Sequence, residues 1–231
     1  MSALTSTFAT GPRPSPGRGR AVVVSALLML TAAAAPQNGP RAGIVRVRLD
    51  TTAGRILLAL DARRAPKTVE NFMAYVDDGR FDGTTFYRAA RGKKDPKTGF
   101  IQAGIRTDAR RILPPFPLET TAKTGIRHLD ATVSMARAAS PDSAGGNFVI
   151  TIGPAPQMDA RPDFPGYAAF GHAVGGLDVV KRILALPSGG GVDAFKGQMI
   201  LKPVRIIKAV RLDGKAKPTN QPKAWLLTPA G

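Results

Sequence analysis

The alternation of apolar and polar positions predicts a β-hairpin early in the folded part of the chain. Over residues 44–49, Arg46 and Arg48 alternate with apolar neighbours, which is the period of a strand with one buried face. A second apolar run covers residues 55–60, and the glycine-containing stretch 51–54 separates the two runs. Two strands joined by so short a stretch are typical of a hairpin.

Helical spacing of apolar residues predicts two helices. The first begins near Pro66, whose missing N–H is harmless in a first turn, and Gly79 is placed to end it. Its apolar face consists of Val69, Phe72, Met73 and Val76. A second, shorter helix is predicted over residues 176–186, and its inward face consists of Val179, Val180 and Ile183.

The rest of the pattern consists of short apolar runs that are typical of strands. They cover residues 81–88, 99–104, 131–138, 147–152, 167–174 and 203–212. Strands and helices do not alternate regularly, so the order of elements does not favour a parallel α/β sheet. We therefore predict a mainly β fold, an antiparallel barrel, for one domain over residues 43–213.

Two of these strands bring candidate chemistry together. Residues 81–88 and 99–104 are joined by a basic loop, and alternation places Phe86 and Arg88 on one face of the first strand. Gln102 lies on the second strand. An arginine, a phenylalanine and a glutamine on neighbouring strands form a surface suited to a peptide. Such a surface requires no metal, thiol or nucleotide.

These strands resemble the cyclophilin family of peptidyl-prolyl cis-trans isomerases. The family has a Phe-His-Arg strand and then Gly-Phe-Met-x-Gln-Gly-Gly, which here reads Phe86-Tyr87-Arg88 and, over residues 99–104, Gly-Phe-Ile-Gln-Ala-Gly. Residues 66–72 also match the family motif Pro-Lys-Thr-x-Glu-Asn-Phe. The resemblance implies a closed eight-stranded antiparallel β-barrel capped by two α-helices. It also implies isomerase activity on X–Pro bonds and no cofactor.

The resemblance further implies a set of site residues. Arg88 would donate a hydrogen bond to the prolyl nitrogen, and Gln102 would hold Arg88 and contact the substrate backbone. Val149 and Met158 would form apolar walls for the proline ring, while Phe100 aligns with either of two family positions. The substrate-binding residues implied in this way are Phe86, Tyr87, Phe100, Ile101, Ala136, Arg137, Ala138, Asn147, Val149, Met158 and Tyr167.

Several site positions depart from the family pattern, among them Val149 for a phenylalanine and Met158 for a leucine. Tyr87 and Tyr167 replace histidines, and Arg137 replaces an asparagine. Asn147 replaces a glutamine and has a shorter reach, and Gln157 replaces the tryptophan associated with cyclosporin binding. We therefore expect weak sensitivity to cyclosporin. Because these substitutions lie at the edge of the implied site, there is an alternative function: a cyclophilin-like peptide-binding or chaperone module with weak or no isomerase activity.

Composition and charge exclude some other functions. The 231-residue chain has no cysteine, which excludes thiol chemistry, and His128 and His172 lack the grouping with carboxylates or cysteines that a metal site needs. The formal charge is +17, but the basic residues are scattered without interleaved aromatics, so nucleic-acid binding is not expected. A third hypothesis is a basic surface-binding protein that uses residues 91–97, with strongly salt-dependent binding. The expected partners are proline-containing polypeptides, and the expected state is a monomer.

The start of the chain has the pattern of an export signal. Arg13, Arg18 and Arg20 precede the apolar run 21–30, and small residues follow it; this is the arrangement of a secretory signal peptide, here over residues 1–35. The run is shorter than the roughly 20 residues of a membrane span. We therefore expect a periplasmic or secreted protein of the exported bacterial type, without a stable membrane partner. An uncleaved anchor is the alternative.

Two further segments flank the predicted domain. Residues 36–42 form a short linker before it. Residues 214–231 follow it and contain three prolines and the only tryptophan, Trp225. Because terminal segments with few apolar residues are often poorly anchored, we predict a loosely attached, flexible C-terminal tail.

Overall fold

The computed structural model describes residue 11 and residues 42–227. The predicted signal peptide and linker, residues 1–35 and 36–42, lie outside the described residues except for Gly11 and Ala42. Within the described part, no helix combines the length and apolarity needed to cross a bilayer.

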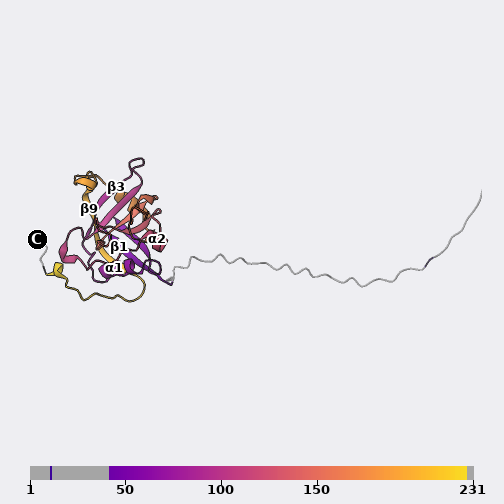
Figure 1. Ribbon diagram of the computed structural model, residues 1–231, viewed down its shortest axis with the longest axis horizontal. Helices are drawn as coiled ribbons and strands as arrows, with labels where there is room; N and C mark the ends of the chain where they lie inside the picture. The colour runs from indigo at the N-terminus through magenta and orange to yellow at the C-terminus, as the bar shows by residue number, and fades with distance from the viewer. Residues whose placement is uncertain (1–10, 12–41, 228–231) are drawn as a thin grey trace, which may run out of the picture. The chain divides into compact units, whose positions relative to one another are not determined.

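The domain is built on a closed antiparallel β-barrel (Figure 1). Its eight strands are β1 (Ile44–Thr51), β2 (Gly54–Asp61), β3 (Thr85–Arg91), β4 (Gly99–Gly104), β5 (Thr132–Met135), β6 (Asn147–Ile152), β7 (Ala169–Gly175) and β9 (Met199–Arg211). They follow each other in the order β1-β2-β7-β5-β6-β4-β3-β9, and pairing of β1 with β9 closes the barrel. The two-residue strand β8 (Ser188–Gly189) pairs only with β9. The predicted fold is confirmed.

Both predicted helices are present, and a third is added. Helix α1 (Pro66–Asp77) has Pro66 in its first turn, and α3 (Leu177–Ala185) matches the second prediction. Gly79 follows α1 with φ +71°, the left-handed conformation that commonly ends a helix. The third helix, α2 (Thr121–Thr124), is a single turn capped by the side chain of Thr120. Four 3₁₀ turns cover Ala109–Arg111, Pro156–Met158, Asp193–Phe195 and Ala224–Leu226.

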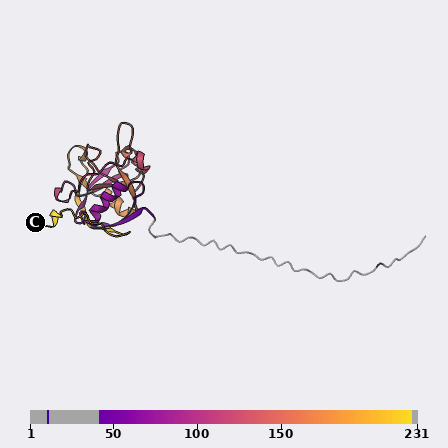
Figure 2. The ribbon, with the colours of Figure 1, turned by 60° about the horizontal axis from the view of Figure 1, so that its bottom comes forward.

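The barrel interior and the inner faces of α1 and α3 form one apolar core. The alternation predicted for the first hairpin is present, since Val47 and Leu49 of β1 are fully buried. Phe72 of α1 extends the core to the aromatic rings of Phe81 and Phe148, with ring centroids 5.0 and 5.2 Å away. Figure 2 shows α1, in indigo, lying against the strands. Aromatic packing of this kind fixes α1 on the barrel.

Strand β3 contains a β-bulge that changes the predicted alternation. Phe86 pairs with Ala103 and Arg88 pairs with Gln102, so the ladder skips Tyr87. As a result Phe86 is fully buried in the core, whereas Arg88 is partly exposed on the outer face. The prediction that Phe86 and Arg88 share a face is therefore wrong. A bulge re-aims the side chains that follow it, and here it turns Arg88 outward.

The described part of the C-terminal segment, residues 214–227, packs on the domain. The ring of Trp225 lies 4.7 Å from the guanidinium carbon of Arg80. The backbone N–H and the hydroxyl of Thr219 donate to the carboxylate of Asp78 at 2.9 and 2.5 Å. Since Asp78 and Arg80 also form a buried ion pair, this segment is anchored at several points, unlike the loosely attached tail predicted from the sequence.

Candidate active site

Arg88 is held by three neutral acceptors. Its Nη1 donates to Oε1 of Gln102 at 3.0 Å, its Nε to Oε1 of Gln198 at 2.8 Å, and its Nη2 to the carbonyl oxygen of Ala194 at 3.1 Å. A guanidinium has five N–H groups, so these bonds fix its plane and leave one N–H on each Nη atom for a ligand. The predicted contact between Arg88 and Gln102 is therefore present.

Aromatic rings shield the guanidinium. The ring centroids of Phe100 and Phe195 lie 5.1 and 4.2 Å from its Cζ atom. Burial lowers the pKa of Arg88, but an arginine remains charged at neutral pH. A fixed charge with reduced access to water makes stronger hydrogen bonds than one in open solvent.

An apolar surface lies next to Arg88 on the outside of the barrel. Val149 is the cross-strand neighbour of Gln102 and forms a small cluster with Met158 that is separate from the barrel core. Phe100 and Tyr167 pack against this cluster. The complete set is Val149, Ala155 and Met158, with Phe100, Ala136 and Tyr167 at its edge. Five predicted substrate-binding residues are thus brought together beside Arg88.

Two predicted substrate-binding residues lie elsewhere. Phe86 and Ile101 are fully buried in the barrel core. Ile101 faces Ala89 across one side of β4 and Ile150 across the other. Because neither side chain reaches the outer surface, we assign Phe86 and Ile101 to the core rather than to peptide contact.

Tyr87 and Asn147 border the site and hold Arg106. The hydroxyl of Tyr87 donates to Oδ1 of Asn147 at 3.2 Å. The amide of Asn147 also bonds both backbone groups of Arg106, accepting from its N–H at 2.8 Å and donating to its carbonyl at 2.9 Å. Burial raises the pKa of Tyr87 to about 12. Tyr87 therefore keeps its proton at neutral pH and acts as a donor.

Arg137 and Ala138 form a further part of the rim, next to Ala136, whose backbone N–H donates to the Asn147 carbonyl at 2.9 Å. Arg137 donates to the carbonyl of Gly166 at 2.9 Å and to those of Ala138 and Ala139 at 2.9 and 3.1 Å. Its Cζ lies 5.0 Å from the ring centroid of Tyr167. The backbone N–H of Ala138 bonds a serine hydroxyl of its own loop. Arg137 therefore ties the rim to Tyr167 and so to the apolar surface.

The site residues that the sequence did not predict come from one loop, residues 190–198, between β8 and β9. This loop supplies Gln198, Ala194 and Phe195, all of which contact Arg88. It is closed by a hydrogen bond from the Gly197 N–H to the Gly190 carbonyl at 2.5 Å. The sequence signal is the glycine run 189–191 followed by Phe195, but nothing in the sequence links it to Arg88, which lies 110 positions before Gln198.

Comparisons with known proteins show the family. The family model for cyclophilin type peptidyl-prolyl cis-trans isomerase/CLD matches residues 45–211, which span the whole barrel. The chain belongs to the cyclophilin family. The peptidyl-prolyl cis-trans isomerase cyp18 of Streptomyces antibioticus is 39% identical over 147 residues, covering 62% of this chain and 85% of the relative. Peptidyl-prolyl cis-trans isomerase A of Dickeya dadantii is 38% identical over 138 residues, covering 59% and 70%.

Solved structures agree on the fold of this cyclophilin. A crystal structure of a cyclophilin type peptidyl-prolyl cis-trans isomerase of Cryptosporidium parvum matches with a TM-score of 0.58 and 22% identity, covering 74% of this chain and 99% of that one. A second crystal structure of the same protein, in the presence of the dipeptide Ala-Pro, matches with a TM-score of 0.57, 23% identity and coverage of 73% and 99%. At this identity the likeness shows the barrel fold.

Two large hollows of the cyclophilin lie away from Arg88. One, of about 850 Å³, runs along α1 beside residues 114–117. The other, of about 750 Å³, includes Arg91, the first residue of the predicted basic patch. Arg91 donates to the carbonyl of Leu184 and to the hydroxyl of Ser188, both at 2.9 Å. It therefore fixes the end of α3, and neither hollow is lined by Arg88 or by the apolar surface beside it.

A buried Ser-His-Asp arrangement supports the apolar surface. Nδ1 of His128 lies 2.7 Å from Oδ1 of Asp159, and its Nε2 lies 2.8 Å from the hydroxyl of Ser134. A carboxylate only accepts hydrogen bonds, so in the neutral imidazole Nδ1 is the donor and Nε2 accepts from Ser134. Ser134 is fully buried and cannot meet a substrate carbonyl. The arrangement is structural: Asp159 adjoins Met158 and anchors its loop.

Mild acid is expected to destabilise the cyclophilin through its two histidines. Burial lowers the pKa of both His128 and His172, whereas the pKa of a histidine in an unfolded chain is about 6.5. Below that value the unfolded state binds more protons, so the free energy of unfolding falls as pH falls. Urea unfolding between pH 7.5 and pH 5, above the range where aspartates titrate, measures this slope. His172→Gln should have a shallower slope, and a wild-type stability that does not change with pH would contradict the assignment.

Proposed function

We propose that this cyclophilin catalyses rotation about X–Pro peptide bonds and that Arg88 stabilises the twisted state. The planar amide resists rotation with a barrier of about 20 kcal/mol. In the twisted state the prolyl nitrogen becomes pyramidal and its lone pair can accept a hydrogen bond. A donor that acts only then raises the rate rather than the affinity. The observation that carries the proposal is the fixed guanidinium of Arg88, with an N–H free on each Nη atom beside an apolar surface.

The apolar surface gives the proline ring a binding site. Val149 and Met158 are almost fully buried, while Phe100 is partly exposed beside them, so a ring placed here would exclude water from Arg88. Gln102 is tied to Arg88 through Oε1 and to the Tyr87 hydroxyl through its amide, which leaves one amide N–H for a substrate carbonyl. A related structure determined in the presence of Ala-Pro supports proline-containing peptides as substrates.

The reaction breaks no covalent bond and transfers no proton. The loss of a histidine at Tyr87 is therefore compatible with turnover, because no general acid or base is required. Tyr87 retains its hydroxyl proton, with a pKa of about 12, and supports the site through Asn147. Proline-containing segments of folding proteins are the substrate class that this chemistry fits, because exposed X–Pro bonds isomerise slowly on their own.

A short X–Pro peptide tests this function. The cyclophilin, at concentrations well below that of the peptide, should accelerate the relaxation of a non-equilibrium cis population. The matched control is the same peptide with the proline replaced by alanine, which should not compete. A folded protein that binds the peptide without accelerating relaxation would establish the alternative function, a binding module.

Gln198 is expected to act through Arg88. Replacing Gln198 by alanine removes the 2.8 Å bond that orients Nε and should lower kcat about tenfold, equivalent to about 1.4 kcal/mol. KM should change less, because Gln198 does not belong to the apolar surface. Gln221→Ala, in the C-terminal segment, is the control and should match wild type. Equal effects of the two variants on kcat would show that Gln198 does not position Arg88.

We also propose that the protein is exported. The leader pattern of residues 1–35 supports this. Expression of the full chain in a bacterial host, followed by amino-terminal sequencing of the product from the periplasm or medium, tests it. Export predicts a new terminus near residue 36, whereas an intact Met1 in the cytosolic fraction would contradict it.

A further inference from the structure

The three arginines around the site have no carboxylate partner, a property that they share, among the described residues, with Arg63, Arg91, Arg127 and Arg205. Away from the site, ion pairs with aspartates are common: Arg46–Asp213, Arg64–Asp61, Arg80–Asp78, Arg182–Asp178 and Arg211–Asp77. Over the described residues, no ion pair within 4.0 Å involves Arg88, Arg106 or Arg137. These three side chains rest on carbonyls, amides and aromatic rings instead. Their positive charges are thus left without a carboxylate.

The two rim arginines are also held in place. Arg106 has φ +53°, a conformation that non-glycine residues rarely adopt, and the amide of Asn147 clamps its backbone. Its guanidinium carbon lies 5.3 Å from the ring centroid of Tyr87. Arg137 uses Nε and Nη1 for its three carbonyl bonds, so both N–H groups of Nη2 remain for a ligand. Such side chains lose little conformational entropy on binding.

The carboxylates nearest in sequence to the rim are already engaged. Asp108 pairs with Arg110 at 2.8 Å, and Asp159 is bonded to His128 at 2.7 Å. Asp193 lies in the loop that contacts Arg88 and is exposed. Asp142, five residues after Arg137, is exposed as well and accepts the Leu118 N–H at 2.8 Å. Two exposed carboxylates do not balance three guanidiniums, so the field at the site is positive.

From these placements we infer that the cyclophilin prefers proline segments flanked by carboxylate side chains. This inference rests on the proposed function, because it uses the same site and names its substrate class. Arg137 lies against Tyr167 of the apolar surface, and Arg106 lies against Tyr87, the residue before Arg88, so residues flanking a bound proline would pass near both charges. Arg88 adds to the attraction but remains the donor for the prolyl nitrogen. Asp or Glu next to the X–Pro pair would supply the missing counter-charge.

Matched peptides test the preference. Two peptides with one X–Pro bond differ only in carrying Glu or Gln at the positions that flank the X–Pro pair. At low ionic strength, kcat/KM for the Glu peptide should exceed that for the Gln peptide about three- to tenfold, the range expected for exposed ion pairs. The ratio should shrink as salt is raised, because salt screens these charges. Kd values for both peptides are measured alongside.

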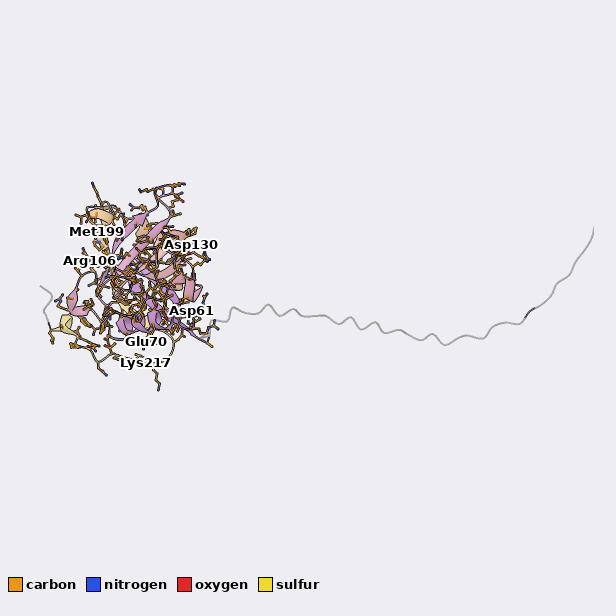
Figure 3. The ribbon with its side chains drawn as sticks, viewed as in Figure 1. Asp61, Glu70, Arg106, Asp130, Met199 and Lys217 are labelled. Carbon is orange, nitrogen blue, oxygen red and sulfur yellow. The ribbon has the colours of Figure 1, made fainter. Side chains whose placement is uncertain are left out.

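Charge-removing variants locate the effect. Arg106→Gln and Arg137→Gln should each lower the Glu/Gln ratio, whatever happens to the absolute rate. Arg63→Gln is the matched control: Arg63 is exposed, and Asp61, two residues before it, lies on the opposite side of the domain from Arg106 in Figure 3. This variant should keep the wild-type ratio.

The outcomes separate the two claims. If both peptides are turned over with a Glu/Gln ratio of kcat/KM near one, the acidic preference is wrong and the isomerase activity stands. The same holds if Arg106→Gln and Arg137→Gln leave the ratio unchanged. If neither peptide is turned over but the Glu peptide has the lower Kd, the isomerase activity is wrong and the acidic preference of the site stands. A ratio lowered equally by Arg63→Gln would show a diffuse effect of net charge and would also overturn the assignment to the rim.

Discussion

Replacing Arg88 by alanine is expected to lower kcat/KM for an X–Pro peptide about 100- to 1000-fold, the usual effect of removing a donor that acts in the transition state. Arg88 lies on the outer face of β3 and contributes nothing to the barrel core, so the variant should fold. Its Gln102 and Gln198 partners would lose one acceptor bond each, which is a modest cost in stability. Circular dichroism and the unfolding midpoint check that the fold is kept.

A lysine at the same position separates charge from geometry. Arg88→Lys keeps the positive charge but lacks the planar fork that bonds three acceptors and still presents an N–H to the substrate. We expect its activity to lie between that of wild type and that of Arg88→Ala. If the alanine variant retains activity within about threefold of wild type, which is about 0.7 kcal/mol, Arg88 is not the catalytic donor.

Replacing Arg80 by alanine is expected to lower the free energy of unfolding by about 3–5 kcal/mol, the cost of leaving one partner of a buried ion pair uncompensated. The Arg80 and Asp78 side chains are 1% and 0% exposed, with Nε and Oδ2 2.8 Å apart. Arg80 also donates to the carbonyl of Pro222 at 3.1 Å and stacks on Trp225. The variant would therefore release the C-terminal segment as well as the ion pair.

Arg182→Ala is the control for this effect. Its pair with Asp178 is equally close, at 2.6 Å, but both side chains are more than half exposed, and exposed pairs contribute little. Urea unfolding at neutral pH compares the two variants. A similar loss of stability in both would mean that burial does not decide the effect. Unchanged stability of Arg80→Ala would show that the segment is not anchored through this pair.

The sequence predicts the parts of the fold that depend on local pattern. The alternation around Arg46 and Arg48 specifies a half-buried strand, and Pro66 and Gly79 set the bounds of α1, because each depends only on its neighbours. The family motifs fix the order of the strands, and Val149 and Met158 cluster beside Gln102 as that order predicts; their contact with a proline ring stays a prediction. The barrel and most of the candidate site thus follow from short stretches of sequence.

What the sequence did not predict depends on contacts between distant segments. The bulge at Tyr87 arises from the pairing of β3 with β4 and β9. Strict alternation assigns successive residues to opposite faces, so it cannot predict a residue that the pairing skips. Gln198 reaches Arg88 across 110 positions of the chain, and its own neighbours give no sign of this. The local sequence around Trp225 predicts a loose tail because its partner, Arg80, lies in a distant segment of the chain.

The most direct test of the account compares binding and turnover of one peptide on two proteins. Exchange between cis and trans forms is measured by NMR at saturating X–Pro peptide, and Kd is measured in the same titration, for wild type and for Arg88→Ala. A donor that acts only in the twisted state predicts that exchange on the enzyme slows about 100-fold or more while Kd changes little. Exchange that persists in the variant, or a loss of exchange fully explained by weaker binding, would contradict the account.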